Sequence, residues 1–330
     1  MEQVFFINPV AGKRDASAEL VPQIQAAARR LQLPQPQIVV TQYAGQAREA
    51  ARQYAASGTP AALYACGGDG TLNELVQGAA GSANVAVGCV PCGSGNDYVR
   101  NFGAAGQAPF LDFAAQLQAQ PCRVDLLQTS LGIGIDICAA GLDAQVAYGI
   151  PKFRRLPGCG GTAAYTLSIL QAMLSRFGHR LRVAIDGKEY TGTYMMAAIC
   201  NGGYYGGGYQ AAPYAAMDDG LLDIVLVKPI SRIQVAGILA KYKAGQHMQD
   251  ADTIVPEFRS FMTFYRARSV EMQVLDNRPI IATIDGECAP VMELKAEVLP
   301  SALNVLLPRP ACGSAVIRGL YECPMQAKAK

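Results

Sequence analysis

The sequence predicts two domains: an α/β domain with a parallel sheet and flanking helices, followed by a β-rich sandwich. Three observations support this prediction. The chain has 330 residues, which is long for one hydrophobic core. Its first third alternates short apolar runs with helical patterns, as in a parallel sheet covered on both faces. After about Val124, β-rich segments separated by turn residues replace this alternation, which is typical of antiparallel sandwiches.

The first domain, residues 1–125, is expected to alternate strictly between strands and helices. The strands are assigned to Val4–Asn8, Gln37–Thr41, Ala61–Cys66 and Asn84–Val90, and the helices to Ser17–Leu31, Gln46–Ser57 and Thr71–Ala80. Ligands of such sheets bind beyond the carboxyl ends of the strands. The loops that follow these strands are therefore expected to converge on one edge.

The second domain, residues 126–308, is expected to be the β-rich sandwich that holds the substrate. Its strands are assigned to Ile133–Ala139, Leu181–Ile185, Tyr194–Cys200, Leu221–Val227, Val270–Leu275 and Ile280–Ile284. Asp186-Gly187 is a strong hairpin signal. Two helical inserts are expected near Ala163–Ser175 and Ile230–Ala244. The segment 309–330 is expected to return to the first domain.

Composition argues against several classes of protein. The net charge of +2 at pH 7 lacks the basic excess of nucleic-acid binders, so no nucleic-acid partner is expected. The chain has no run of 18 uncharged apolar residues and no secretory signal at its N-terminus, so we expect a cytoplasmic protein. Cys89 and Cys92 stand without a second cysteine pair, which disfavours zinc. His179 and His247 lack partner spacing, which disfavours a Ser-His-Asp triad.

The most informative segment follows the third predicted strand. Gly67-Gly68-Asp69-Gly70-Thr71 joins that strand to a helix. Consecutive glycines allow close approach to the backbone, and the N–H groups of a helix N-terminus attract phosphate. Asp69 would repel that phosphate unless a metal ion or a proton transfer involves it. We interpret the segment as a nucleotide-dependent phosphoryl-transfer site, with a plain strand–helix turn as the alternative.

Two further loops at strand ends carry polar groups. Asn8–Lys13 ends in a cation, and Pro91–Asp97 offers a hydroxyl and an amide. Neither the Walker pattern nor the dinucleotide fingerprint is present. Each loop alone is a weak signal. Their shared position on one sheet edge makes coincidence a poor explanation.

In this order, the motifs resemble those of the diacylglycerol kinase catalytic domain, which soluble bacterial diacylglycerol kinases and related lipid kinases share with sphingosine and ceramide kinases. The matching segments cover nearly the whole chain. They are Asn8–Lys13, Gly67–Glu74, Gly93–Arg100, Gly141–Ala144, Asn201–Gly203, Gly206–Gly208, Asp218–Asp223 and Ile284–Glu287. The resemblance implies a lipid kinase whose first domain is like those of NAD kinase and phosphofructokinase, with ATP in a cleft between the domains.

The resemblance also implies which residues bind ATP. They are Asn8, Pro9, Val10, Ala11, Gly12, Thr41, Gly67, Gly68, Asp69, Gly70, Thr71, Leu72, Asn73 and Ser94. Their backbone N–H groups suit phosphates, and the hydroxyl groups suit the phosphates or the sugar. Asp69 is suited to orient the Mg²⁺ that accompanies ATP. Lys13, Asp69 and Asp97 resemble a charged network of the family, with ordinary surface pairing as the alternative.

The general base is expected in the segment Asp285-Gly286-Glu287. In soluble bacterial members the matching motif holds the proposed base; Glu287 is the first candidate here and Asp285 the second. In an extended segment both side chains point the same way, so both are expected to line the site. A plain hairpin turn is the alternative.

A structural Mg²⁺ is implied by the resemblance of Asp218–Asp223 to the segment that holds this ion in soluble bacterial members. The matched ligands are the Asp219 side chain and the backbone carbonyls of Ala216 and Leu221. One carboxylate with carbonyls and water suits the octahedral preference of Mg²⁺. Without the resemblance, the segment would be assigned as a β-turn.

The expected partner is a lipid substrate at a membrane surface, with peripheral association of the protein; a homodimer is left open. The apolar segment Tyr165–Phe177 has basic neighbours, which are Lys152, Arg154, Arg155, Arg176 and Arg180. Such a helix lies on an anionic bilayer or packs on its own domain. The expected reaction converts diacylglycerol to phosphatidic acid, with sphingoid bases, ceramide or another lipid alcohol as alternative substrates. An NAD kinase and a silent lipid- or nucleotide-binding regulator are more distant alternatives.

Overall fold

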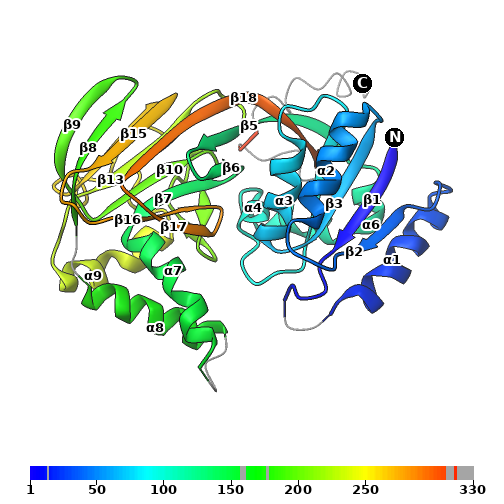
Figure 1. Cartoon of the computed structure of the whole chain (residues 1–330), viewed down its shortest axis with the longest axis horizontal. Coiled ribbons are helices and arrows are strands. Elements are labelled where there is room, and N and C mark those ends of the chain that lie inside the picture. The colour runs from blue at the N-terminus through cyan, green and yellow to red at the C-terminus, as the bar shows by residue number, and fades with distance from the viewer. Residues whose placement is uncertain (13–14, 157–160, 176–177, 310–315, 318–330) are drawn as a thin grey trace. The chain divides into compact units, whose positions relative to one another are not determined.

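The chain folds into two compact units. The computed structural model describes residues 1–12, 15–156, 161–175, 178–309 and 316–317. The first unit contains residues 1–126, 216–220 and the described residues from 299 onward, and the second contains 127–215 and 221–298 (Figure 1). The chain thus returns to the first unit at Leu299, inside a strand, and not at residue 309 as expected.

The first unit is built on a sheet with strand order β2-β1-β3-β4-β18. The strands are β1 (Glu2–Ile7), β2 (Gln37–Val40), β3 (Ala61–Gly67), β4 (Val85–Pro91) and the C-terminal part of β18 (Glu293–Leu307). All neighbours run parallel, and β18 joins β4 with Asn304 opposite Ala86. Every residue of β3 is buried, because helices cover both faces of this central strand. The predicted parallel sheet is confirmed.

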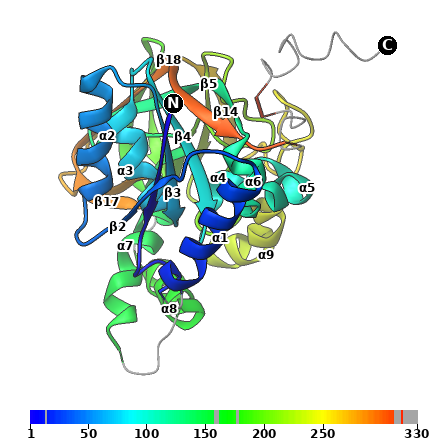
Figure 2. The ribbon, with the colours of Figure 1, turned by 90° about the vertical axis from the view of Figure 1, so that its right-hand side faces the viewer.

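Helices cover the two faces of this sheet in pairs (Figure 2). On one face, α1 (Ser17–Arg30) packs with α6 (Phe113–Leu117) over the stacked rings of Phe5 and Tyr64, whose centroids are 4.2 Å apart. On the other face, α2 (Gln46–Ser57) packs with α3 (Asp69–Ala79). The short helices α4 (Asp97–Arg100), α5 (Gly103–Gln107) and a 3₁₀ turn (Ala108–Leu111) follow β4.

The second unit contains two antiparallel sheets. The first has the order β14-β13-β10-β7-β16-β17, and the second joins β9, β8 and β15 to the first part of β18. The strands are β7 (Ile137–Gly141), β8 (His179–Ile185), β9 (Lys188–Tyr194), β10 (Met196–Cys200), β13 (Leu222–Val227), β14 (Met262–Ala267), β15 (Ser269–Val274), β16 (Ile280–Ile284) and β17 (Glu287–Val291). Buried aliphatic side chains from both sheets, such as Val183 and Ile224, form one shared core. The predicted sandwich is confirmed.

Three helices of the second unit pack on the outer face of the first of these sheets (Figure 1). They are α7 (Leu142–Arg154), α8 (Gly161–Leu174) and α9 (Arg232–Lys243). The short strands β11 (Tyr204–Tyr205) and β12 (Tyr209–Gln210) add tyrosines to the same core. Within the described residues, no helix has the length and apolar character needed to cross a membrane.

Two features of the second unit differ from the sequence-based expectation. The strand expected over Ile133–Ala139 is interrupted between β6 (Gly132–Gly134) and β7, because the Asp285 carboxylate takes the N–H groups at this break. Helix α7 was not expected, since it contains Gly149 and Pro151, which disfavour helix interiors. Gly149 has a packing reason: a Cβ there would lie 2.3 Å from the Ser168 hydroxyl on α8.

Candidate active site

The loops after β1, β3 and β4 are tied together at the carboxyl edge of the sheet. The Asn8 backbone N–H donates to the Cys66 carbonyl (3.0 Å), and the Asn8 side-chain amide donates to the Thr71 hydroxyl (3.0 Å). The N–H groups of Cys92 and Gly93 both donate to the Gly67 carbonyl, at 2.8 and 3.1 Å. The three loops that the sequence placed on one edge therefore do meet there.

Glycine is required where these loops touch. A Cβ on Gly93 would lie 2.3 Å from the Gly68 Cα, so the two backbones pass in direct contact. Gly12 has φ +79°, and a Cβ there would lie 2.6 Å from the Cys92 carbonyl oxygen. Ser94 and Val10 are exposed beside these contacts. The result is a glycine-walled surface at the N-terminus of α3, which suits an anion.

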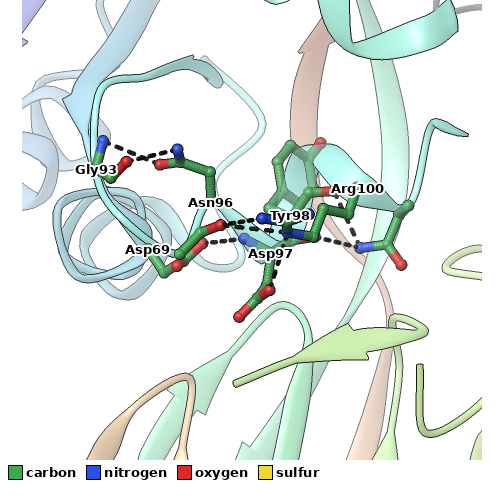
Figure 3. A network of polar contacts seen from close by, with 8 residues as sticks. Asp69, Gly93, Asn96, Asp97, Tyr98 and Arg100 are labelled. Carbon is green, nitrogen blue, oxygen red and sulfur yellow. Dashed lines mark hydrogen bonds and ion pairs between the residues drawn. The ribbon is translucent and has the colours of Figure 1, made fainter. Parts of the chain in front are cut away.

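The Asp69 carboxylate is held by the start of α4 (Figure 3). Its Oδ1 accepts the backbone N–H of Asp97 at 2.7 Å. Burial raises the pKa of Asp69, and the backbone N–H groups of Asp97, Asn96 and Tyr98 oppose that rise. Asp69 thus joins the loop after β3 to the loop after β4, a role that its sequence position did not reveal.

Asp97 and Asn96 complete this polar cluster. Asn96 has φ +54° and exchanges hydrogen bonds with the Gly93 backbone, accepting its N–H at 3.0 Å and donating to its carbonyl at 2.8 Å. The buried Asp97 pairs with Arg100 at 3.3 Å, and Arg100 also donates to the Gly95 carbonyl. The charged network expected for Lys13, Asp69 and Asp97 stays a prediction, because Lys13 lies outside the described residues and the two aspartates are linked through the Asp97 backbone N–H.

The remaining predicted ATP-binding residues differ in position. Thr41 follows β2 and donates its hydroxyl to the Ile7 carbonyl at 3.3 Å, beside the loop after β1. The side chains of Leu72 and Asn73 are buried in α3, and the Leu72 N–H donates to the Gly68 carbonyl. The structure therefore gives Leu72 and Asn73 packing roles behind the loop surface.

Glu74 has a structural role that sequence reasoning missed. Its carboxylate accepts the N–H groups of Gly45 (2.8 Å) and Ala47 (3.2 Å), at the start of α2. It thereby satisfies donors that a helix N-terminus leaves unpaired. The sequence could have indicated that Glu74 has a specific role, because Glu74 is the last residue of the glycine-rich motif Gly67–Glu74.

In the second unit, Asp285 and Gly286 form the two-residue turn of the β16–β17 hairpin. Asp285 has φ +45° and Gly286 φ +94°, with Ile284 opposite Glu287 in the ladder. The extended geometry expected for this segment is therefore wrong. The side chains of Asp285 and Glu287 have different environments.

The Asp285 carboxylate accepts hydrogen bonds from three backbone N–H groups. It accepts N–H groups from Ile135 (2.7 Å), Asp136 (3.2 Å) and Ile137 (3.0 Å), where the chain enters β7. The buried Asn201 supports the same turn by donating its amide to the Ile135 carbonyl at 2.7 Å. Glu287, in contrast, is exposed at the start of β17. Of the two carboxylates, Glu287 is the better placed to accept a proton from a substrate.

The segment predicted to hold a structural metal lies beside Asp125. The Asp125 carboxylate accepts the N–H groups of Gly220 and Ser301, each at 2.7 Å. Burial raises the pKa of Asp125, and the charges of Asp219 and Asp218 raise it further despite these bonds. A cation would relieve this repulsion, so the residues fit the predicted site. Ala216 is buried in this turn. Among the described residues, no three or more His, Cys, Asp or Glu side chains are grouped to hold a metal, and the predicted site would use one carboxylate with backbone carbonyls instead.

Comparison with known proteins identifies the family. Residues 2–129 match the diacylglycerol kinase catalytic domain, and residues 136–307 match the YegS C-terminal NAD kinase beta sandwich-like domain. The second match alone covers more than half of the chain. The chain belongs to the diacylglycerol kinase family of lipid kinases. The resemblance read from the motifs is confirmed.

Relatives of this lipid kinase family match over most of their length. A "Probable lipid kinase YegS-like" protein of Shewanella frigidimarina is 30% identical, over 74% of this chain and 76% of the relative. The diacylglycerol kinase of Bacillus subtilis is 24% identical, over 75% and 78% of the two chains. The crystal structure of a diacylglycerol kinase from Bacillus anthracis has a TM-score of 0.65 at 20% identity, covering 94% of this chain and 97% of that chain. At that identity the structural match shows the fold alone.

Proposed function

We propose that this lipid kinase transfers the γ-phosphoryl group of ATP to the hydroxyl of diacylglycerol, giving phosphatidic acid. The observation that carries the proposal is the convergence of three glycine-rich loops on the N-terminus of α3, with Asp69 fixed among them. Backbone N–H groups and a helix N-terminus are suited to hold phosphates in this position. The chain belongs to a family of lipid kinases, and membership of a kinase family supports ATP as the phosphoryl donor that this surface holds.

In the proposed reaction, Glu287 is the general base. It accepts the proton of the lipid hydroxyl as that oxygen attacks the γ-phosphorus, and the β–γ bridging oxygen leaves with ADP. Asp285 positions Glu287 by fixing the hairpin turn through its three backbone bonds. General-base assistance of this kind contributes roughly 10²–10⁴-fold in rate.

Mg²⁺ is proposed at two places. With ATP, the carboxylates of Asp69 and Asp97 are suited to orient the ion directly or through water, and it would neutralise charge on the phosphates. At the turn beside Asp125, a structural Mg²⁺ would be held by the Asp219 side chain and by the carbonyls of Ala216 and Leu221. Burial is the main cause that raises the pKa of Asp125, and the charges of Asp219 and Asp218 raise it further; a cation would offset this repulsion, which supports the second site.

We further propose that α8 docks on an anionic bilayer. This helix buries its small residues, Ala164, Ser168 and Ala172, while Leu170 and Leu174 are 55% and 79% exposed. A helix that only packs on its own domain buries its large side chains instead. Of the predicted basic neighbours, Lys152 and Arg154 are exposed on α7, Arg155 is exposed directly after it, and Arg180 is exposed on β8, while Arg176 lies outside the described residues. Apolar side chains flanked by cations suit the surface where the lipid substrate resides.

The N-terminus of α9 lies against the end of α8 and adds an exposed apolar side chain. Arg232 donates to the carbonyls of Met173 (2.6 Å) and Ser175 (3.2 Å), which fixes the start of α9 against the end of α8. The next residue, Ile233, is 86% exposed. Leu174 and Ile233 are thus exposed apolar side chains on two helices that Arg232 holds together.

The test is ATP consumption against a panel of diacylglycerol, a sphingoid base, ceramide and NAD. We expect turnover with diacylglycerol and none with NAD, and loss of lipid turnover in Glu287→Gln. The matched control is Glu189→Gln, which changes an exposed glutamate of the same unit on β9. NAD turnover without lipid turnover would overturn the proposal.

A further inference from the structure

The loop after β2 carries an exposed aromatic ring beside the phosphate-binding loops. Tyr43 is 55% exposed, and its hydroxyl donates at 2.9 Å to the carboxylate of Glu49, in the first turn of α2. Two residues before Tyr43, the N–H and the hydroxyl of Thr41 both donate to the Ile7 carbonyl, which fixes this loop to the end of β1. The Tyr43 ring is therefore held at its hydroxyl end, while more than half of the residue stays exposed.

Arg48, also in the first turn of α2, is a cation that the described residues leave unpaired. Its guanidinium has no ion-pair partner among them, and its buried Nε has no hydrogen-bond acceptor. The Nη2 atom lies beside Gly45, the N-cap of α2, since a Cβ on that glycine would be 3.3 Å from it. The Glu74 carboxylate instead accepts N–H groups at the same helix start. A cation at the positive end of a helix and a buried donor without an acceptor are both unfavourable, and a bound anion would relieve both.

Both side chains lie where the start of α2 meets α3. Helices α2 and α3 each follow a strand of the parallel sheet, so both begin at its carboxyl edge. Long side chains of a helix extend toward its N-terminus, and the position of the Arg48 Nη2 beside Gly45 shows this direction. The Gly45 N–H donates to Glu74 of α3 at 2.8 Å, which holds the two helices together at this end. The guanidinium is therefore at the same sheet edge as the glycine-walled surface at the start of α3.

The order of groups along this edge fits the order of groups in ATP. The Asp69 carboxylate, suited to the Mg²⁺ of the terminal phosphates, is bound to the Asp97 N–H, on the side of α3 that faces the end of β4. In the other direction from β3, the sheet continues to β1 and then to β2, about 10 Å away, since neighbouring strands are about 4.8 Å apart. A triphosphate that begins at Asp69 and crosses the start of α3 thus directs its α-phosphate and its base toward Arg48 and Tyr43.

We propose that Tyr43 and Arg48 bind the adenosine monophosphate portion of ATP: the Tyr43 ring stacks on the adenine base, and the Arg48 guanidinium donates to the α-phosphate. The inference rests on the proposed function and adds two residues that recognise its phosphoryl donor. A base has two flat apolar faces, and an aromatic ring fixed by its hydroxyl offers a matching surface. The guanidinium fork matches the geometry of phosphate oxygens, which supply both an acceptor and a negative charge.

Calorimetry with two ligands tests the role of the ring. ATP carries a base and three phosphates, whereas inorganic tripolyphosphate carries the phosphates alone. Tyr43→Ala is expected to raise the Kd of ATP about tenfold, through loss of one stacking contact, and to leave the Kd of tripolyphosphate unchanged. Tyr43→Phe keeps the ring and is expected to bind ATP within about threefold of the wild type. An equal rise for both ligands in Tyr43→Ala, or no rise for ATP, would overturn this role.

Arg48→Met tests the guanidinium and separates binding from folding. Methionine keeps an unbranched apolar side chain but has no charge and no donor. Because the change removes a buried donor without an acceptor, the Tm is expected to be at or above that of the wild type. The Kd values of ATP and tripolyphosphate are both expected to rise at least about tenfold. The control Arg52→Met, at an exposed position one turn further along α2, should bind both ligands normally. Unchanged Kd values in Arg48→Met would overturn the inference.

Lipid phosphorylation distinguishes failure of the inference from failure of the proposed function. With dioctanoylglycerol as acceptor, Tyr43→Ala and Arg48→Met are expected to raise the KM for ATP as they raise its Kd. If the wild type phosphorylates dioctanoylglycerol and both variants keep its KM for ATP, the inference is overturned and the reaction stands. If the wild type phosphorylates no lipid but the calorimetric pattern appears, the reaction is wrong and the nucleotide contacts stand. If the wild type binds no ATP, both are overturned.

Discussion

Asp285 and Ile137 hold each other through two reciprocal hydrogen bonds: the Asp285 carboxylate accepts the Ile137 N–H at 3.0 Å, and the Asp285 N–H donates to the Ile137 carbonyl at 3.1 Å. The same carboxylate also accepts the N–H groups of Ile135 and Asp136. The two carboxylates of Asp285-Gly286-Glu287 therefore differ in their surroundings. The Asp285 carboxylate stabilises the turn, and the Glu287 carboxylate is exposed directly after it.

Asp285→Ala is expected to destabilise the protein. The change leaves three backbone N–H groups without their acceptor, and we expect a loss of about 3 kcal/mol in the free energy of unfolding. Urea denaturation measures it, with Glu287→Ala as the control because Glu287 is exposed. If both variants have wild-type stability, the structural role of Asp285 is wrong.

Gly93→Ala and Gly70→Ala distinguish effects on stability from effects on ATP binding at the glycine-rich loops. A Cβ at Gly93 would lie 2.3 Å from Gly68, so we expect a loss of about 2 kcal/mol in stability and weaker ATP binding. A Cβ at Gly70 meets no described atom within 4 Å, so stability is expected to change by less than about 1 kcal/mol.

Calorimetry with ATP gives the other half of this comparison. If the phosphates lie over the start of α3, the Gly70→Ala methyl group occupies part of their space and the Kd for ATP rises. An unchanged Kd in both glycine variants would place the nucleotide elsewhere.

His247 is expected to contribute to instability in acid. It is fully buried, with Nε2 2.9 Å from the Ala211 carbonyl, and burial lowers its pKa to about 4. The unfolded state takes up the proton near pH 6.5 and the folded state only near pH 4. Stability is therefore lost as the pH falls between these values, by about 3 kcal/mol from this group.

His247→Gln removes the titrating ring, so its stability is expected to fall less steeply between pH 6.5 and 4. The slopes of unfolding free energy against pH are compared for the two proteins. Parallel slopes would show that His247 is not the group responsible. Other groups with shifted pKa values, such as Asp69 and Asp125, are common to both and cancel in the comparison.

The sequence predicted regular elements well where local pattern and burial agree. Helix Gln46–Ser57 and strand Ile280–Ile284 have the predicted bounds, since an alanine-rich amphipathic pattern determines the helix and a short, mostly apolar run determines the strand. It failed for β18, because Pro300 and Ser301, which has φ +49°, look like a turn. That strand is held instead by partners far away in sequence, such as Asp125, which accepts the Ser301 N–H.

The sequence predicted which loops form the candidate site, but not which backbone groups its carboxylates bind. Glycine-rich motifs report a phosphate-binding surface because they constrain the backbone directly. The tasks of Glu74 and Asp285 depend on N–H groups at Gly45 and Ile135, in distant parts of the chain.

Charge reversal at the C-terminal end of α7 tests the proposed membrane surface. The double variant Arg154→Glu/Arg155→Glu is expected to reduce binding to phosphatidylglycerol vesicles by at least about tenfold, since each basic residue near such a surface contributes about 1 kcal/mol. Lys188→Glu, on the exposed edge strand β9, is the control and should bind normally. Unchanged vesicle binding by the double variant would contradict the proposal that α8 docks on an anionic bilayer.

The most direct test of the central claim is transfer of labelled phosphate from γ-labelled ATP to dioctanoylglycerol by the wild type, Glu287→Gln and Glu189→Gln. Labelled phosphatidic acid is expected from the wild type and from Glu189→Gln. For Glu287→Gln we expect a rate lower by roughly 10²–10⁴-fold, with an unchanged Tm. Wild-type transfer rates in Glu287→Gln, or no lipid product from any of the three proteins, would contradict the proposed reaction.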